Sequence, residues 1–242
     1  MKNEKKQTIE NRTCTNCGKD YAHEPIMIDG RDICDNINMC DPCAETQEER
    51  ANQRRREQAA HAEWLRVVPK TYRETDLDYG DYPKDLHRYA VKWIRDLLVL
   101  KTNSTQIMFG MIGESGKCKT RIMGQIVKHA IWIGVKCEWV NATQFQWSCQ
   151  HEFDKENGSR ARAFLSLYRS CPFLAFDDLG KQRWTDGVES KFYDLIENRT
   201  ANALPMVWSS NAGMGELEAM LTADRAKPIV GRLIGFSNII LV

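Results

Sequence analysis

The chain has 242 residues, with 34 lysines and arginines against 33 aspartates and glutamates, so its formal net charge is only +1. This length allows one ordinary domain and a small one, and the balanced charge gives no field strong enough to indicate a nucleic-acid partner, although it excludes none. No apolar run approaches the roughly 18 residues that a membrane-spanning helix needs. The charged N-terminal segment lacks the apolar core of a signal peptide, so we expect a cytoplasmic protein with no membrane partner.

Two Cys-x-x-Cys pairs lie near the N-terminus, separated by 22 residues. They are Cys14 with Cys17 and Cys40 with Cys43. This spacing is typical of a structural zinc site with four thiolate ligands, because each pair presents two sulfurs on a tight turn. The segment 26–31 predicts a strand that enters a turn, as in a zinc ribbon. Cys34 could substitute for Cys40, but it has no Cys-x-x-Cys partner, and we leave it out of the ligand set.

A disulfide framework is the alternative interpretation of these cysteines. The total of nine cysteines is odd and no signal peptide precedes them, which argues against it. A domain of about 45 residues has too little core to fold alone, and zinc binding at roughly 10–16 kcal/mol can supply the missing stability. Structural zinc modules bind proteins as readily as nucleic acids, and the basic residues here are matched by acids, so no basic patch argues for DNA.

The segment Ala44–Val68 is rich in Gln, Glu, Arg and Ala and contains neither Pro nor Gly, so it predicts a helix. The triplet 54–56 is Arg-Arg-Arg, which is typical of a solvated helix face; a nucleic-acid contact is the alternative. We therefore divide the chain into a zinc ribbon at 1–46, a helical linker at 47–68 and a larger domain at 69–242.

Apolar and helical segments alternate through the larger domain. The predicted strands are Ile107–Gly110, Cys137–Val140, Phe173–Phe176, Met206–Ser209 and Ser237–Leu241. The predicted helices are Leu86–Leu100, Thr120–Ile133, Ala142–His151, Ser159–Tyr168, Val188–Ala201 and Leu217–Leu221. This alternation, with strands apolar on both faces, predicts an α/β fold with a parallel, doubly wound sheet.

A glycine-containing loop joins the first of these strands to the next helix. Its residues are Gly113, Glu114, Ser115, Gly116, Lys117, Cys118, Lys119 and Thr120. This is the setting of a phosphate-binding loop, in which backbone N–H groups surround a triphosphate. We expect Lys119 to reach the outer phosphates and Thr120 to hold Mg²⁺ through its hydroxyl. Cys118 departs from the pattern, which has Gly there, and a register built on Gly116 and Lys117 fits worse. An ordinary loop before a helix is the alternative.

An acid pair follows the third predicted strand, 57 residues after Thr120. Asp177 and Asp178 emerge where ligands bind in open α/β sheets, at the carboxyl end of a strand. The pattern resembles a Walker B motif, in which Asp177 would hold Mg²⁺ through water and Asp178 would polarise the attacking water. Paired acids after a strand are often only a solvated turn, but the phosphate-binding loop and the acid pair support each other.

Two further polar residues follow later in the domain. Asn211 comes after the fourth strand and could orient the attacking water, although a turn Asn before Gly213 is the alternative. Arg232 lies in a short apolar-flanked segment and suits transition-state charge supplied from a neighbouring subunit, although a surface arginine is the alternative.

The order of these motifs resembles the DnaC/IstB-like AAA+ ATPases, which are replicative helicase loaders and transposition helpers. The resemblance covers about 69–242. It implies an AAA+ P-loop fold, ATP and Mg²⁺ as cofactors, Asn211 as sensor 1 and Arg232 as the arginine finger. It also implies that Tyr72, in the segment Pro69–Arg73, lines the adenine pocket. Glu189 and Arg199 stand where the family carries an acid and an arginine. No later arginine of a sensor-2 element is recognisable.

The resemblance implies an ATP-dependent helicase loader that works as a homo-oligomer when ATP is bound. It would bind a replicative helicase through the N-terminal zinc domain and assist its deposition on single-stranded DNA. A transposition helper with a transposase as client is the nearest alternative; such helpers often lack a zinc ribbon, whereas some loaders carry one. An adaptor that binds ATP without turnover is the third alternative, because Cys118 departs from the phosphate-loop pattern and the sensor-2 arginine is not recognisable.

Overall fold

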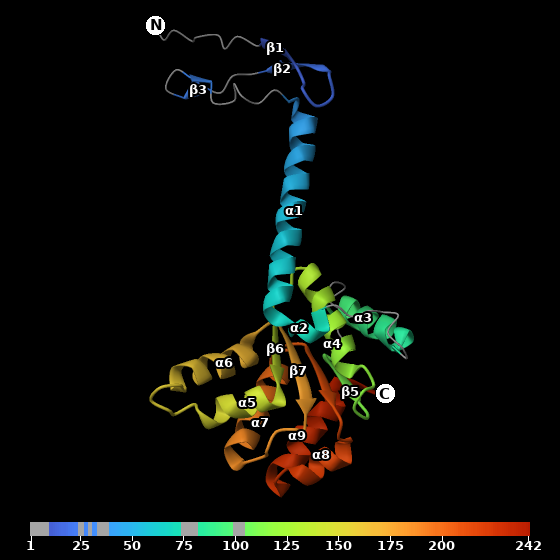
Figure 1. The fold of residues 1–242 in the computed structure, drawn as a ribbon, viewed down its shortest axis with the longest axis vertical. Coiled ribbons are helices and arrows are strands. Elements are labelled where there is room, and N and C mark those ends of the chain that lie inside the picture. The colour runs from blue at the N-terminus through green and yellow to red at the C-terminus, as the bar shows by residue number, and fades with distance from the viewer. Residues whose placement is uncertain (1–9, 24–26, 29–30, 33–38, 74–81, 99–104) are drawn as a thin grey trace. The chain divides into compact units, whose positions relative to one another are not determined.

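The computed structural model describes residues 10–23, 27–28, 31–32, 39–73, 82–98 and 105–242 (Figure 1). The chain divides into two compact units, Met1–Ala59 and Ala60–Val242. This boundary falls within a helix, and the three-part division at residues 46 and 68 stays a prediction. Cys34, and the parts of the predicted elements that fall at residues 26, 29–30 and 99–100, lie outside the described residues.

The described residues of the first unit form two short antiparallel strand pairs. They are β1 (Glu10–Thr13) with β2 (Asp20–His23) and β3 (Met27–Ile28) with β4 (Arg31–Asp32). The second pair overlaps the strand and turn predicted at 26–31. The first pair was not predicted, because its strands are short and polar and show no apolar alternation. Thr13 Oγ1 donates to Asp20 Oδ1 at 2.7 Å and ties β1 to β2 beside the first cysteine pair.

Helix α1 runs from Asp41 to Val67 and confirms the helix predicted from Ala44 onward. It begins three residues earlier than expected, so Cys43 lies in its first turn. Between residues 41 and 59 none of its side chains is buried. A helix that is polar all round does not gain its stability from a packed face, and here the absence of Pro and Gly and the many strong helix formers favour it instead.

Five strands of the described second unit form one parallel sheet in the order β6–β7–β8–β5–β9. Their bounds are β5 Met108–Ile112, β6 Cys137–Asn141, β7 Phe173–Leu179, β8 Met206–Ser210 and β9 Ser237–Leu241. The predicted parallel, doubly wound sheet is confirmed. Strand β7 continues three residues beyond the predicted Phe176, which brings both acids into or against the sheet.

Successive side chains of the central strands enter two separate cores, one on each face of the sheet. On one face Leu174, Phe176 and Trp208 are fully buried, and on the other Phe173 and Val207 are. The first face is covered by α5 (Ala142–Gln150), α6 (Gly158–Ser170), α7 (Asp186–Ala201), α8 (Met214–Met220) and α9 (Ala223–Phe236). The second is covered by the end of α1 with α2 (Lys70–Arg73), α3 (Lys84–Leu98) and α4 (Lys119–Trp132) (Figure 1).

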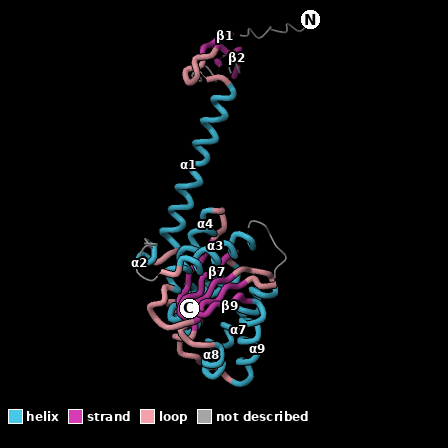
Figure 2. The backbone as a smooth tube through the Cα atoms, turned by 90° about the vertical axis from the view of Figure 1, so that its right-hand side faces the viewer, coloured by secondary structure: helices cyan, strands magenta, loops and turns pink. Residues whose placement is uncertain are grey.

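Two local features hold the sheet in place. Gly110 on β5 leaves room for the indole of Trp208 on β8, because a Cβ at Gly110 would lie 2.3 Å from the ring. The indole Nε1 donates to Ser237 Oγ on β9 at 3.0 Å, so Trp208 spans three neighbouring strands. This packing holds β5, β8 and β9 in register, and the loop that follows β5 therefore starts from a fixed point at the carboxyl end of the strand. Figure 2 shows the strands of the sheet in magenta among the cyan helices.

Helix α9 was not predicted as a helix. Sequence reasoning placed Arg232 on a short apolar-flanked segment, whereas it lies in the second half of a helix of 14 residues. Pro228 within the helix and the glycines around Arg232 weaken the helical signal. The burial of Ala226, Ile229 and Leu233 at spacings of three and four residues shows the apolar face that packs on the sheet.

Candidate nucleotide-binding site and cysteine cluster

The loop between β5 and α4 folds around the side chain of Lys119. This lysine is only 6% exposed, and its Nζ donates to the carbonyl oxygens of Gly113 and Glu114, both at 2.7 Å. Burial lowers the pKa of Lys119, while the nearby carboxylate of Asp178 acts in the opposite direction. An ammonium group held within a loop at a helix N-terminus is suited to an anionic ligand. Lys117, by contrast, is exposed.

Cys118 adopts the left-handed backbone conformation that the phosphate-binding pattern reserves for glycine. Its φ is +58° and its ψ is 13°, and it is the N-cap residue of α4. Gly116, two residues earlier, also has a positive φ of +87°. A residue with a Cβ in this conformation costs roughly 1–2 kcal/mol. The loop therefore has the shape that the pattern requires and carries strain at the one position where the sequence departs from it.

Asp177 is held by hydroxyl groups from two other elements. Thr120 Oγ1 on α4 donates to Asp177 Oδ1 at 3.1 Å, and Ser209 Oγ on β8 donates to the same oxygen at 2.5 Å. Burial raises the pKa of Asp177, and the hydrogen bond from Ser209 opposes this shift. A hydroxyl and a carboxylate brought together from positions 57 apart form an oxygen donor set of the kind that Mg²⁺ prefers.

Asp178 lies at an irregularity in the pairing of β7 with β8, where the register shifts between Phe176 and Leu179. Its φ is +62°, and its backbone N–H donates to Ser209 Oγ at 2.9 Å in place of a regular ladder bond. Its carboxylate forms an ion pair of 2.9 Å with the ammonium of Lys181. Ser209 thus fixes both acids, one through its carboxylate and one through its backbone.

These groups surround a cavity of about 250 Å³. Its lining residues are Tyr72, Ser115, Gly116, Cys118, Lys119, Thr120, Arg121, Asp178, Lys181 and Asn211. The cavity thus brings together five residues of the loop, the second acid, Asn211 and Tyr72. Of the other site residues predicted for the nucleotide, Gly113, Glu114, Lys117 and Asp177 do not line it, and the roles assigned to all of them stay predictions. The ring of Tyr72 stacks on Trp139 with centroids 6.4 Å apart and planes 15° apart.

Three residues of this site were missed from the sequence. Ser209 was noted only as part of a strand tip, although a polar pair at the end of an otherwise apolar strand was the available signal. Arg121 and Lys181 line the cavity, but nothing in their local sequence separates them from surface cations. Their role depends on the turns that bring them to the cavity.

Arg232 lies on α9 and does not line this cavity. Its guanidinium forms an ion pair with Glu197 and lies over the ring of Tyr193, 5.1 Å from the centroid. A residue that acts on a neighbouring subunit need not face its own subunit's cavity, so its role as arginine finger stays a prediction.

The other two residues that the resemblance singled out have structural roles. The Glu189 carboxylate accepts from the backbone N–H and the hydroxyl of Thr222, at the start of α9. Arg199 is fully buried and donates to the carbonyls of Tyr168, Cys171 and Pro205. Both therefore join helices and strands of the core.

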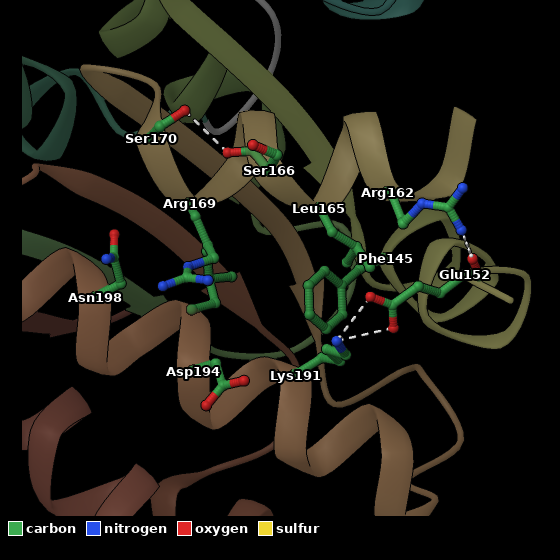
Figure 3. A pocket seen from close by; sticks show the side chains of 11 residues that line it. Phe145, Glu152, Arg162, Leu165, Ser166, Arg169, Ser170, Lys191, Asp194 and Asn198 are labelled. Carbon is green, nitrogen blue, oxygen red and sulfur yellow. Dashed lines mark hydrogen bonds and ion pairs between the residues drawn. The ribbon is translucent and has the colours of Figure 1, made fainter. Parts of the chain in front are cut away.

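A larger cavity, of about 460 Å³, lies between α5, α6 and α7 (Figure 3). Phe145 forms one wall, and an ion pair of 2.8 Å between Lys191 and Glu152 crosses one end. Arg169 and Asp194 line the rest with opposite charges. The cavity shares no lining residue with the phosphate loop, and its mixed charges do not match a polyphosphate.

The four cysteines of the first unit form one cluster. The sulfurs of Cys14, Cys17, Cys40 and Cys43 all lie within 4.8 Å of one another, and those of Cys17 and Cys40 are 3.8 Å apart. Four sulfurs at about 2.3 Å from one ion, in a tetrahedron, would be about 3.8 Å apart. The donor set and its spacing therefore fit zinc.

Backbone hydrogen bonds shape each half of this cluster. Gly18 N–H donates to Cys14 O, and Cys43 N–H donates to Cys40 O. Hydrogen bonding to the backbone of Cys40 lowers the pKa of the Cys14 thiol to about 6. The backbone of Cys43 acts in the same direction on Cys40, but the Cys43 side chain and desolvation outweigh it and raise the pKa of Cys40 to about 12. Thiols packed so closely cannot all ionise without a cation among them.

No helix among the described residues combines the length and the apolar character needed to cross a bilayer.

No family model matches the sequence, and no curated protein matches it either. Solved structures do match. The chain is similar to DnaI at 20% identity with a TM-score of 0.57, covering 74% of this chain and 93% of that one. It is similar to the DnaC helicase loader at 18% identity with a TM-score of 0.55, covering 72% and 99%.

A third similar structure is the replication initiator DnaA bound to AMPPCP and single-stranded DNA. The identity is 16% and the TM-score 0.56, over 72% of this chain and 50% of that one. The chain thus spans about half the length of this DnaA chain and of a DNA replication initiation factor that it also matches. These likenesses show that the chain shares its fold with DnaI, DnaC and DnaA, which confirms the fold that the sequence resemblance predicted. At such identities they show the fold alone.

Proposed function

We propose that this chain binds ATP with Mg²⁺ and hydrolyses it, and that it uses this cycle to load a replicative helicase onto single-stranded DNA. The observation that carries the proposal is that Lys119, Thr120 and Asp178 line one cavity, and that Thr120 also donates to the buried Asp177. An ordinary loop before a helix does not need Lys119 buried among its own carbonyls or Thr120 against the buried carboxylate of Asp177.

The proposal assigns roles to residues in and beside the cavity. The loop N–H groups and Lys119 bind the phosphates, and the stacked ring of Tyr72 borders the base. Thr120 and Asp177 hold Mg²⁺, which would neutralise phosphate charge when bound. Asp178 accepts a proton from the attacking water and Asn211 orients that water. Arg232 of a neighbouring copy would reach the γ-phosphate, so the active form is a homo-oligomer.

The cysteine cluster is proposed to hold Zn²⁺ through Cys14, Cys17, Cys40 and Cys43. Zinc there closes the small first unit, because strands of four and two residues provide too little core to fold alone. We propose that this unit contacts the helicase, and that the protein is cytoplasmic.

Contact with single-stranded DNA is proposed at α6. This helix carries Arg160, Arg162 and Arg169 and no acidic residue. The guanidinium of Arg160 lies 5.8 Å from the ring of Trp147 and 5.3 Å from that of Phe164. An exposed arginine beside two aromatic rings is suited to backbone phosphates and stacked bases.

Two measurements test the proposal. Co-elution of the purified chain with a hexameric replicative helicase in the presence of ATP supports loading, and absence of co-elution with and without ATP counts against it. Phosphate release in the presence of single-stranded DNA tests turnover. Release that Asp178→Asn abolishes supports an ATPase; nucleotide binding with no release in the unmodified protein points instead to an adaptor. Co-elution with a transposase alone would favour a transposition helper.

A further inference from the structure

Lys181 occupies an unusual place beside the acid that is proposed to activate water. It follows Gly180, whose φ is +98°, in the turn that ends β7, and its backbone N–H donates to Asp178 O at 3.0 Å. This turn bends the chain back, so that the Lys181 ammonium reaches Asp178 Oδ1 at 2.9 Å. Both side chains line the same cavity as Lys119.

The pair is accessible and can separate. The Lys181 side chain is 50% exposed and that of Asp178 is 32% exposed, so their attraction is screened by water and breaks at small cost. The flexible stem of a lysine allows its ammonium to move by several ångströms without any backbone change. While the pair is closed, however, the carboxylate that should accept a proton from water is occupied by a cation.

The remaining charges of the cavity favour an anion of high charge. Lys119, Arg121 and Lys181 line it against the one carboxylate of Asp178. Burial lowers the pKa of Lys119, and the positive charge of Lys181 acts in the same direction. The two ammonium groups therefore repel each other. A terminal phosphate carries more charge than a carboxylate and would relieve this repulsion.

We propose that Lys181 is a specificity residue for the γ-phosphate, which exchanges its ion pair with Asp178 for one with the terminal phosphate of ATP. The proposal rests on the proposed nucleotide function and adds its regulation. A diphosphate lacks the γ-phosphate, so Lys181 stays paired with Asp178. A triphosphate supplies a γ-phosphate that pairs with the Lys181 ammonium and thereby frees the Asp178 carboxylate.

Release of Asp178 prepares the hydrolytic step. The oxygen of water forms a bond to the γ-phosphorus, and the bond between that phosphorus and the β,γ-bridging oxygen breaks, with its electron pair leaving on ADP. The water proton passes to Asp178, which can accept it only when Lys181 no longer covers it. Asp178 then gives this proton to solvent, and departure of the phosphate lets the ionised carboxylate pair with Lys181 again.

Calorimetric titration of the full chain with ADP and with AMPPCP, at fixed Mg²⁺, tests this exchange. In Lys181→Gln, AMPPCP affinity should fall about ten-fold, the value of one charged hydrogen bond, while ADP affinity changes by less than about two-fold. Lys181→Arg should restore AMPPCP affinity. Lys155→Gln, which removes an exposed lysine between α5 and α6, is the matched control and should leave both affinities unchanged.

Each outcome decides the matter. Equal losses for both nucleotides would make Lys181 a general electrostatic or structural residue, and no loss for either would remove it from the site; both results overturn the inference and leave the ATPase proposal standing. If the unmodified chain bound neither nucleotide, the inference and the proposed function would fail together. A loss confined to AMPPCP and rescued by arginine supports the exchange.

Discussion

The hydroxyl of Ser209 lies 2.5 Å from Oδ1 of Asp177, across the boundary between β8 and β7. Ser209→Ala should weaken Mg²⁺-dependent nucleotide binding and lower stability by about 1–3 kcal/mol, because it removes one partner of a buried carboxylate and leaves the Asp178 N–H without its acceptor. Calorimetric titration with AMPPCP over a range of Mg²⁺ concentrations, together with urea unfolding, measures both effects.

The neighbouring Ser210 is a matched control. It is equally buried, and its hydroxyl donates to Leu179 O instead of to an acid. Ser210→Ala should therefore lose stability but keep its Mg²⁺ dependence. Equal Mg²⁺ dependence in the two variants would show that Ser209 only supports the strand.

Substitutions at Cys118 separate the effect of its backbone conformation from that of its thiol. Cys118→Gly should bind ATP at least as tightly as the unmodified chain, because glycine adopts a φ of +58° without strain. Cys118→Val should lower both nucleotide affinity and melting temperature, since a β-branched residue is the least compatible with this conformation. Thermal unfolding and nucleotide titration provide the comparison, and loss of binding in the glycine variant would assign the thiol a direct role.

How far the sequence predicted this site depended on whether the residues were contiguous. The phosphate loop and the acid pair are local patterns flanked by strands, and their convergence follows from the rule that parallel strands end at one edge of a sheet. Ser209 and Lys181 could not be assigned in this way. Their contacts arise from the register shift between β7 and β8 and from the turn at Gly180, which are properties of the folded sheet.

The fold shows the same division. Strands buried on both faces were predictable from apolar runs, whereas α9 was hidden by Pro228 and β1 with β2 by their polar composition. The sequence showed only that Cys118 stands where the pattern has Gly, whereas its left-handed φ of +58° is a property of the folded loop.

We expect Asp177 to lower the free energy of unfolding at neutral pH while its carboxylate serves Mg²⁺ binding. Its pKa is raised in the folded chain, chiefly by burial, so it binds its proton more tightly there than in the unfolded chain. Stability is therefore lost as the pH rises from the ordinary aspartate range, about 4, through the raised folded value. Asp177→Asn should be more stable than the unmodified chain at pH 7 and gain progressively less as the pH falls toward about 4, while losing Mg²⁺-dependent hydrolysis.

Urea unfolding of Asp177→Asn and the unmodified chain at several pH values tests this sign. A variant that is less stable at pH 7 would mean that the hydrogen bonds from Thr120 and Ser209 outweigh the burial of the charge.

Removal of one cysteine ligand should affect only the first unit. Cys14→Ser should release zinc to a colorimetric chelator and unfold the residues before about 46, while ATP affinity stays unchanged, because the cavity is built entirely from the second unit. Cys149→Ser, on α5, is the control that leaves the cluster complete. A loss of ATP binding in Cys14→Ser would mean that the two units do not fold independently.

Arg232 provides a test of assembly. Arg232→Ala should keep nucleotide affinity, because Arg232 does not line the cavity of its own subunit, and lose turnover in the assembled state by a factor of about 10³–10⁵. Stability should change little, because its ion pair with Glu197 is partly exposed. Arg225→Ala on the same helix is the matched control, since it also removes an arginine that forms an ion pair within its own subunit, here with Asp186. Phosphate release measured at increasing protein concentration distinguishes the two variants. The concentration-dependent rate should vanish for Arg232→Ala and persist for Arg225→Ala. A rate that persists in both variants would show that Arg232 takes no part in catalysis.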